Sequence, residues 1–412
     1  MNVLHRVMAH AQRDGWPAVT RKIIHKAAGK ALERLSVNEP DLPVRTEDLQ
    51  ASANNAPHRQ PHPVSGAMNV GWVCTPPGPG SGGHTTFFRM VQGMEERGHR
   101  CALFLYDRNS DDVSRHAAVI RKHWPLMEAE IRSVAEGFHG MDAIVASSWP
   151  TAYAAAAHGS RHLHSFYFIQ DYEPYFYPRG TLYALAENSY RLGFTNIALG
   201  GMIGAVMKSE LGMEPAASVP FACDTRTYRL LEGPEGAPTR HGVVYYAKRA
   251  VDRRGYLLAK LALEQFHAMH PDQEIHIYGD SITGWSIPVN NHGNLPPGDL
   301  NRLYNSTVAG LALSFTNISL VPEELLAAGN VPVLNESAFA AQVLKDPEVI
   351  WAPATPSGLA GALARAVEAN DIQDRASRIA ARRRLDWRVS TDAFAEVLES
   401  ACSGNTILPG SP

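Results

Sequence analysis

The chain of 412 residues is 45% hydrophobic and 19% charged, which is typical of a globular protein with room for two cores. Its formal net charge of −3 lacks the basic excess with which nucleic-acid-binding proteins displace counterions. Four scattered cysteines without a CxxC pair indicate buried thiols in a reducing compartment. No apolar run reaches the length of a membrane span, so we expect a cytoplasmic protein with no nucleic-acid partner.

The N-terminal segment, residues 1–35, is strongly basic. Seven Lys or Arg residues stand against two acidic ones, which leaves a balance of +5. Apolar residues between Ile23 and Leu35 recur at helical spacing with basic residues on the other faces, which predicts a basic amphipathic helix. Such a helix either contacts a membrane surface or packs on its own protein with a solvated basic face. Residues 36–66 are polar and proline-rich and predict a linker, so we group 1–65 as a helical extension with a linker.

From residue 67 onward, short apolar runs alternate with helical patterns. We predict strands at 68–74, 101–107, 142–148, 164–171 and 196–200, with a helix at about 84–97 after a glycine-rich loop. The rhythm restarts after residue 241, with strand-like runs at 242–248, 274–279, 308–314, 331–335 and 348–352. The sequence therefore predicts an α/β protein of two Rossmann-like, doubly wound lobes that face each other across a cleft.

The first glycine-rich loop permits two interpretations. Its segment 78–83 matches GxGxxG, and Asp107 follows near the place where a dinucleotide fingerprint has its ribose carboxylate, so an NAD-dependent oxidoreductase is one alternative. Thr-Pro-Pro stands between the strand and the first glycine, which disfavours the tight turn of that fingerprint. We instead expect Gly82 and Gly83 to let the backbone approach an anionic ligand at the start of the following helix. A loop that binds nothing is the simpler alternative.

A second loop, after the predicted strand 242–248, carries four basic residues: Lys248, Arg249, Arg253 and Arg254. Open α/β sheets bind ligands at the carboxyl ends of their strands, where guanidinium groups can bind phosphate oxygens in pairs. The cluster therefore predicts a diphosphate site, and a solvated run of charges is the alternative.

In this loop the sequence resembles the retaining family-4 glycosyltransferases. That family carries an Arg and, five positions later, a Lys before a Gly; Arg249 and Arg254, followed by Gly255, hold those places. The string YYAKRAVDRRG also resembles the bacterial rhamnosyltransferases of rhamnan and S-layer glycan assembly. The resemblance covers roughly residues 66–402. It implies a GT-B fold whose second lobe binds a nucleotide-diphosphate sugar without a metal ion or other cofactor.

The second motif of that family is a Glu, seven residues and a Glu at a helix start, followed by small residues, a Gly and Pro-Val. Placed by Gly329, the second glutamate falls on Glu324, to which the resemblance assigns the donor ribose, and Glu323 is the alternative one step away. The first glutamate falls on Thr316, so the chain departs from the family there. The run from Ser319 to Glu324 resembles the rhamnosyltransferase subgroup, which also lacks the first glutamate. A helix-start carboxylate that only caps its helix is the alternative.

Two further stretches complete the resemblance and set the domain boundaries. Residues 219–228 resemble the hinge of the family, and Leu-Asp-Trp at 385–387 resembles its crossover back to the first lobe. We therefore predict an acceptor domain at 66–222, a donor domain at 223–385 and a C-terminal helix at 386–412 that crosses back to the first lobe.

The segment 170–178, QDYEPYFYP, follows a predicted strand and combines two carboxylates with four aromatic residues. Aromatic faces stack on sugars, and Asp171 or Glu173 could bond sugar hydroxyls or take the acceptor's proton, while aromatic packing between helices is the alternative. Histidines at 158, 162 and 164 have no accompanying carboxylate, so we expect no metal.

Together these patterns and the resemblance predict a hexosyltransferase with a glycan or lipid-linked acceptor. The resemblance implies dTDP-L-rhamnose as the donor, with GDP- or UDP-hexoses as alternatives. The predicted catalytic residues are Asp171, Glu173 and Arg249. The predicted donor-binding residues are Gly82, Gly83, Arg249, Arg254, Ser319, Glu323 and Glu324. A catalytically inactive GT-B scaffold that binds glycans remains an alternative, since Thr316 departs from the family.

Overall fold

The computed structural model describes residues 41–55, 60–231 and 239–404. The chain divides into two compact units, Met1–Pro43 and Val44–Pro412, and the fold discussed below belongs to the second. The predicted basic helix within residues 1–35 lies outside the described residues.

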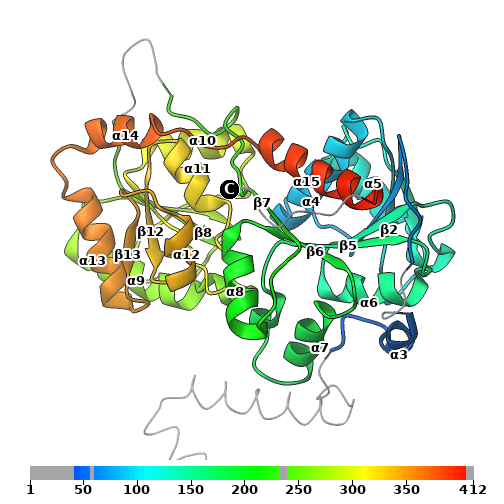
Figure 1. Ribbon diagram of the computed structural model, residues 1–412. Coiled ribbons are helices and arrows are strands. Elements are labelled where there is room, and N and C mark those ends of the chain that lie inside the picture. Colours follow the sequence, from blue (N-terminus) through cyan, green and yellow to red (C-terminus); the bar gives the residue numbers. More distant parts are fainter. Residues whose placement is uncertain (1–40, 56–59, 232–238, 405–412) are drawn as a thin grey trace, which may run out of the picture. The chain divides into compact units, whose positions relative to one another are not determined.

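The first lobe is built on a seven-stranded sheet in which all strands are parallel, in the order β3-β2-β1-β4-β5-β6-β7 (Figure 1). The central strands match the apolar runs of the sequence because both of their faces are covered. Strands β3 and β7 were not predicted; they form the two edges of the sheet and lack a continuous apolar run. The strands are β1 (Asn69–Cys74), β2 (Arg100–Leu105), β3 (Glu130–Ser133), β4 (Ala143–Ala146), β5 (His164–Ile169), β6 (Thr195–Leu199) and β7 (Ala217–Val219).

The second lobe is built on a six-stranded parallel sheet in the order β10-β9-β8-β11-β12-β13. Strand β10 was not predicted, because its sequence NNHG is polar and lies at an exposed edge. The strands are β8 (Val243–Ala247), β9 (Ile275–Gly279), β10 (Asn290–Gly293), β11 (Ala309–Leu311), β12 (Val331–Asn335) and β13 (Ile350–Ala352). Both sheets thus have the strand order of doubly wound folds, which confirms the predicted fold class.

Helices flank both sheets (Figure 1). In the first lobe these are α3 (Thr46–Asn55), α4 (Gly82–Glu96), α5 (Ser114–His123), α6 (Trp149–His158), α7 (Thr181–Ser189) and α8 (Gly201–Leu211), with the short helices η1 (Val134–Glu136) and η2 (Glu173–Phe176). Those that follow are η3 (Asp252–Arg254), α9 (Tyr256–Met269), α10 (Pro297–Ser306), α11 (Val321–Ala327), α12 (Ala338–Val343), α13 (Pro356–Val367), α14 (Ile372–Ala380) and α15 (Trp387–Cys402).

The last helix, α15, returns the chain to the first lobe and packs on α4 and β7. Asp386 caps its N-terminus by accepting a hydrogen bond from the Arg388 N–H at 3.0 Å. The Ser390 hydroxyl donates to the Pro220 carbonyl at 2.6 Å, and the Phe394 ring lies 5.6 Å from that of Trp72. Hydrogen bonds between side chains and the backbone, together with packing on the core of the first sheet, therefore fix the position of α15.

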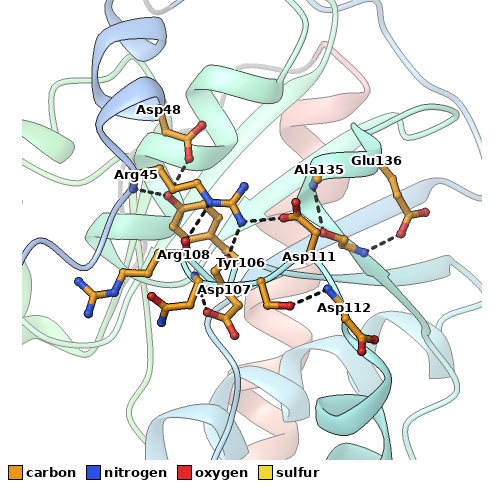
Figure 2. A network of polar contacts seen from close by, with 12 residues as sticks. Arg45, Asp48, Tyr106, Asp107, Arg108, Asp111, Asp112, Ala135 and Glu136 are labelled. Carbon is orange, nitrogen blue, oxygen red and sulfur yellow. Dashed lines mark hydrogen bonds and ion pairs between the residues drawn. The ribbon is translucent and has the colours of Figure 1, made fainter.

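Residues 46–55 form helix α3, although their polar composition was interpreted as part of a linker. The helix packs on α6, and a polar network attaches it to the loop after β2 (Figure 2). Asp48 accepts a hydrogen bond from the Tyr106 hydroxyl at 2.7 Å and lies 2.9 Å from His158 Nε2. The Arg45 guanidinium donates to the Asp107 carbonyl and the Asp111 carboxylate. Buried polar bonds rather than an apolar stripe hold α3 in place, which is why hydrophobic periodicity could not reveal it.

We predict that Asp48→Ala lowers the free energy of unfolding by about 1–3 kcal/mol at pH 7, because it leaves buried partners without their bonds. Burial alone would raise the pKa of Asp48, but the hydrogen bonds from His158 and Tyr106 lower it overall. The Asp48 contribution is therefore present above the unfolded-state pKa and is lost as the pH falls through the folded-state value.

Urea denaturation of the wild type and the variant at pH 7 and at pH 3 measures this difference. The matched control is Asp111→Asn, whose ion pair with Arg45 is solvent-exposed and should cost less than about 1 kcal/mol. Equal effects of the two substitutions would contradict the proposed role of the buried network.

Candidate functional site

The predicted site residues lie in loops at the carboxyl ends of the strands in both sheets. The loops that follow β1 and β5 belong to the first lobe, and those that follow β8 and β11 belong to the second. Because every strand within a sheet is parallel, all of these loops leave from the same edge of their sheet. Hydrogen bonds and ring contacts join the loops of one lobe to those of the other.

The N-terminus of α4 carries the two glycines predicted to approach a ligand. Ser81 caps the helix, and its hydroxyl lies 2.7 Å from His84 Nδ1. A Cβ atom on Gly82 would lie 3.8 Å from Leu320 Cδ1 of the second lobe, and one on Gly83 would lie 3.9 Å from Gln170 Oε1. The start of this 15-residue helix therefore lies where the two lobes meet, and Gly82 and Gly83 are exposed there. Such a helix start favours an anion.

Asp171 lies in the loop after β5 and contacts the second lobe directly. Its Oδ2 accepts a hydrogen bond from the Thr316 hydroxyl at 2.9 Å, and the neighbouring Gln170 carbonyl accepts one from Asn317 Nδ2 at 2.6 Å. The residue as a whole is half-buried, but its Oδ1 is closed to solvent and has no hydrogen-bond partner among the described residues. Burial raises the pKa of Asp171, although the charge of Arg254 and the Thr316 bond act against this shift.

The four basic residues after β8 take separate positions. Arg254 Nη1 donates to the Ser314 hydroxyl at 2.8 Å; burial lowers the pKa of Arg254, and the charge of Asp171 opposes that shift. The Arg253 guanidinium lies 4.0 Å from the centre of the Phe176 ring in the first lobe. Both arginines therefore face the junction between the lobes.

The other two basic residues of this loop turn toward the second lobe. Lys248 Nζ lies 3.1 Å from Asp280, which also accepts the Arg249 N–H at 2.8 Å. The Arg249 guanidinium is exposed and lies 5.9 Å from the Tyr256 ring centre. Of the two predicted diphosphate ligands, Arg254 is thus the one placed beside the first lobe, while Arg249 remains at the surface.

The two glutamates at the start of α11 have different surroundings. Glu323 forms an ion pair with Arg384 at 2.9 Å, which fixes α11 to the chain beyond α14. Glu324 Oε2 accepts a long hydrogen bond of 3.4 Å from the Tyr304 hydroxyl. Burial raises the pKa of Glu324 to about 7, against the effects of Tyr304 and Arg89. Glu324 is therefore the better candidate for a ligand. Ser319 is half-buried in the loop before α11.

Glu173, the second predicted catalytic carboxylate, is engaged by its own lobe. Its Oε2 accepts the N–H of Trp149, the first residue of α6, and the Tyr167 hydroxyl at 3.2 Å. Burial raises the pKa of Glu173 to about 8, against the effect of these bonds. This arrangement favours helix capping over proton transfer to an acceptor.

The sequence interpretation did not identify Arg89 and recorded Thr316 only as a departure from a family pattern. The Arg89 guanidinium lies 4.9 Å from the Trp387 ring centre and 3.7 Å from Asp224, so it joins α4 to the segment predicted as the hinge and to α15. No local motif marks Arg89, because its partners are far away in the sequence. No sequence motif marks three other residues at the junction, because their contacts form only when the loops meet in the fold: Gln170, Asn317 and Ser314.

The structure also places Asp107, the predicted ribose carboxylate of the dinucleotide alternative. Asp107 Oδ1 accepts the Asn109 N–H at 2.9 Å and Oδ2 lies 3.4 Å from His116, so the carboxylate supports its own loop. Within the described residues no group of three or more His, Cys, Asp or Glu side chains could hold a metal ion. None of the helices described here is long and apolar enough to cross a membrane.

Comparison with known proteins matches part of the chain to a family model and a larger part to a named relative. The model of the WsaF N-terminal domain matches residues 133–200. The O-antigen biosynthesis protein RfbC of Myxococcus xanthus is 30% identical over 326 residues, which cover 74% of this chain and 25% of that protein. The chain thus spans about a quarter of the length of this relative.

Solved structures resemble the chain over most of its length. Anabaena Alr3699/HepE, in complex with UDP and glucose, has a TM-score of 0.63 at 15% identity and covers 81% of this chain and 100% of its own. WaaG, a glycosyltransferase involved in lipopolysaccharide biosynthesis, has a TM-score of 0.57 at 15% identity over 80% of this chain and 99% of its own. The chain has the GT-B fold.

We predict that Glu173→Gln preserves the fold and stabilises it at high pH relative to the wild type. A carboxyl whose folded pKa is raised to about 8 keeps its proton in the folded state while the unfolded chain loses it. The wild type therefore loses stability as the pH rises from about 4.5 to 8, and an uncharged amide does not.

Thermal unfolding of both proteins at pH 5 and pH 9 tests this expectation. The difference in melting temperature should be small at pH 5 and favour the variant at pH 9. A variant that is destabilised equally at both values would show that Glu173 is ionised in the folded state at both, which contradicts its raised pKa.

Proposed function

We propose that this chain is a metal-independent, retaining glycosyltransferase. It moves a hexose from a nucleotide-diphosphate donor onto a glycan or lipid-linked saccharide. The observation that carries the proposal is the meeting of three kinds of group at the carboxyl edges of the two sheets. These are the half-buried guanidinium of Arg254, the start of α4 at Gly82 and Gly83, and the carboxylates of Asp171 and Glu324.

The chemistry follows from the charges of these groups. The bond between the sugar's anomeric carbon and the diphosphate breaks, and its electron pair leaves with the phosphate oxygen. Arg254 and the N–H groups of α4 stabilise the charge that develops there, which is the role a divalent cation has in other transferases. The acceptor oxygen bonds to the anomeric carbon on the same face and its proton passes to the departing phosphate oxygen, so the configuration is retained. Glu324 binds the sugar of the donor nucleotide, which is deoxyribose in dTDP.

The donor and acceptor are proposed from resemblance and from the named relatives. The loop after β8 resembles rhamnosyltransferases, so dTDP-L-rhamnose is the proposed donor. RfbC is described as an O-antigen biosynthesis protein, and HepE was solved with UDP and glucose, which supports a nucleotide sugar and a polysaccharide product. A cytoplasmic enzyme that meets a lipid-linked acceptor would contact the membrane peripherally through residues 1–35.

We predict that dTDP or another nucleoside diphosphate raises the melting temperature of the chain in the presence of EDTA, and that NAD does not. A ligand that binds only the folded state stabilises it by mass action. Arg254→Ala should weaken this binding about 10- to 100-fold, because it removes charge-assisted bonds to phosphate.

The matched control is Arg302→Ala, an equal change of charge at an exposed position of α10 in the same lobe. It should bind nucleotide as the wild type does. Stabilisation by NAD alone, or normal binding by Arg254→Ala, would overturn the proposed donor site.

We predict that removing residues 1–40 abolishes sedimentation with anionic liposomes at low salt and leaves transfer to a soluble acceptor intact. Each basic residue near an anionic surface contributes about 1 kcal/mol, and added salt screens it. Removing residues 1–60 should instead destabilise the first lobe as well, because α3 and its contact to Tyr106 are lost. Unchanged sedimentation of the shorter deletion would refute the membrane contact.

A further inference from the structure

We propose that Asp171 of the first lobe supplies the carboxylate that binds the transferred sugar, in place of the glutamate that the resembled motif has at position 316 of the second lobe. The inference rests on the proposed function. The Asp171 carboxylate would bind a hydroxyl group next to the anomeric carbon of the donor hexose. The Asp171–Thr316 hydrogen bond across the lobes is the observation behind it.

The two carboxylate oxygens of Asp171 have different surroundings. The Thr316 hydroxyl is buried and holds Oδ2 at 2.9 Å, which fixes the orientation of the group. Oδ1 is closed to solvent and has no hydrogen-bond partner in the described part of the chain. A buried acceptor without a donor costs about 1–3 kcal/mol, so a ligand hydroxyl that reaches Oδ1 would remove this cost.

A chain of hydrogen bonds links Asp171 to Arg254 of the proposed diphosphate site. Arg254 donates to the Ser314 hydroxyl, and that hydroxyl in turn donates to the Asn317 carbonyl. Asn317 then donates from its amide to the Gln170 carbonyl, one residue before Asp171. Arg254 and Asp171 thus lie at the two ends of one short hydrogen-bonded segment, and the charge of each acts on the other.

Thr316 occupies the position of the first glutamate in the second motif of the resembled family, eight residues before Glu324. The carboxylate that the second lobe lacks there is present at hydrogen-bond distance, but it comes from the first lobe. Glu173 cannot take this part, because its carboxylate caps α6. The site is therefore complete only when the loops of both lobes are in contact.

The experiment compares binding of dTDP and dTDP-L-rhamnose, with UDP and UDP-glucose as a second pair, to the full chain by calorimetry. Asp171→Asn should leave the affinity for the nucleotide within about twofold and weaken that for the nucleotide sugar about tenfold or more. It should lower kcat for transfer by about 10²- to 10³-fold, since it removes a charge beside the reacting carbon. Normal binding of the nucleotide sugar by this variant would overturn the inference.

A carboxylate moved to the other lobe provides the second test. Asp171→Asn combined with Thr316→Glu, or with the shorter Thr316→Asp, should regain at least about tenfold in kcat over Asp171→Asn alone. The matched control combines Asp171→Asn with Thr316→Val and should regain nothing. If both double variants fold and bind nucleotide but neither recovers activity, a carboxylate at position 316 cannot replace that of Asp171, which contradicts the inference. If the wild type binds no nucleotide at all, it is the proposed function that fails.

Discussion

The hydrogen bond between Thr316 and Asp171 is the interaction on which the site depends. It joins the loop after β11 to the loop after β5, so it brings residues from two separate sheets into one site. Parallel strands make this meeting possible, because all loops at the carboxyl edge of a sheet can be used for binding. The chain returns from the second lobe to the first through α15, which packs on α4 and whose Trp387 contacts Arg89. This packing connects the two lobes a second time. Neither lobe alone would present all of the charged groups, since Asp171 comes from the first lobe and Arg254 and Glu324 from the second.

Burial sets the charges within this site. The carboxyls of Asp171, Glu173 and Glu324 all have raised pKa values, and the pKa of Arg254 is lowered, with burial as the main cause in each case. Groups held in this way favour a partner that completes their bonding, and a nucleotide sugar carries both the anionic phosphates and the hydroxyls required. Glu173 differs from the others because the protein itself supplies its partners.

Much of the fold could be predicted from periodicity, and much of the site could not. The central strands are continuous apolar runs because both faces are buried, whereas β3, β7 and β10 lie at edges and leave no such signal. Motif spacing separated Glu324 from Glu323; in the structure Glu323 forms an ion pair with Arg384, whereas Glu324 accepts a long hydrogen bond from Tyr304. Spacing could not show that Arg249 remains exposed while Arg254 faces the junction. Nor could it show that Thr316 meets a carboxylate from 145 residues earlier.

A crystal structure of the full chain with bound dTDP would show whether the loops of both lobes form the donor site. The diphosphate should lie between the Arg254 guanidinium and the N-terminus of α4, with the deoxyribose at Glu324 and Oδ1 of Asp171 on the side where the hexose would begin. A nucleotide bound elsewhere, with Arg254 in contact only with Ser314, would contradict the account.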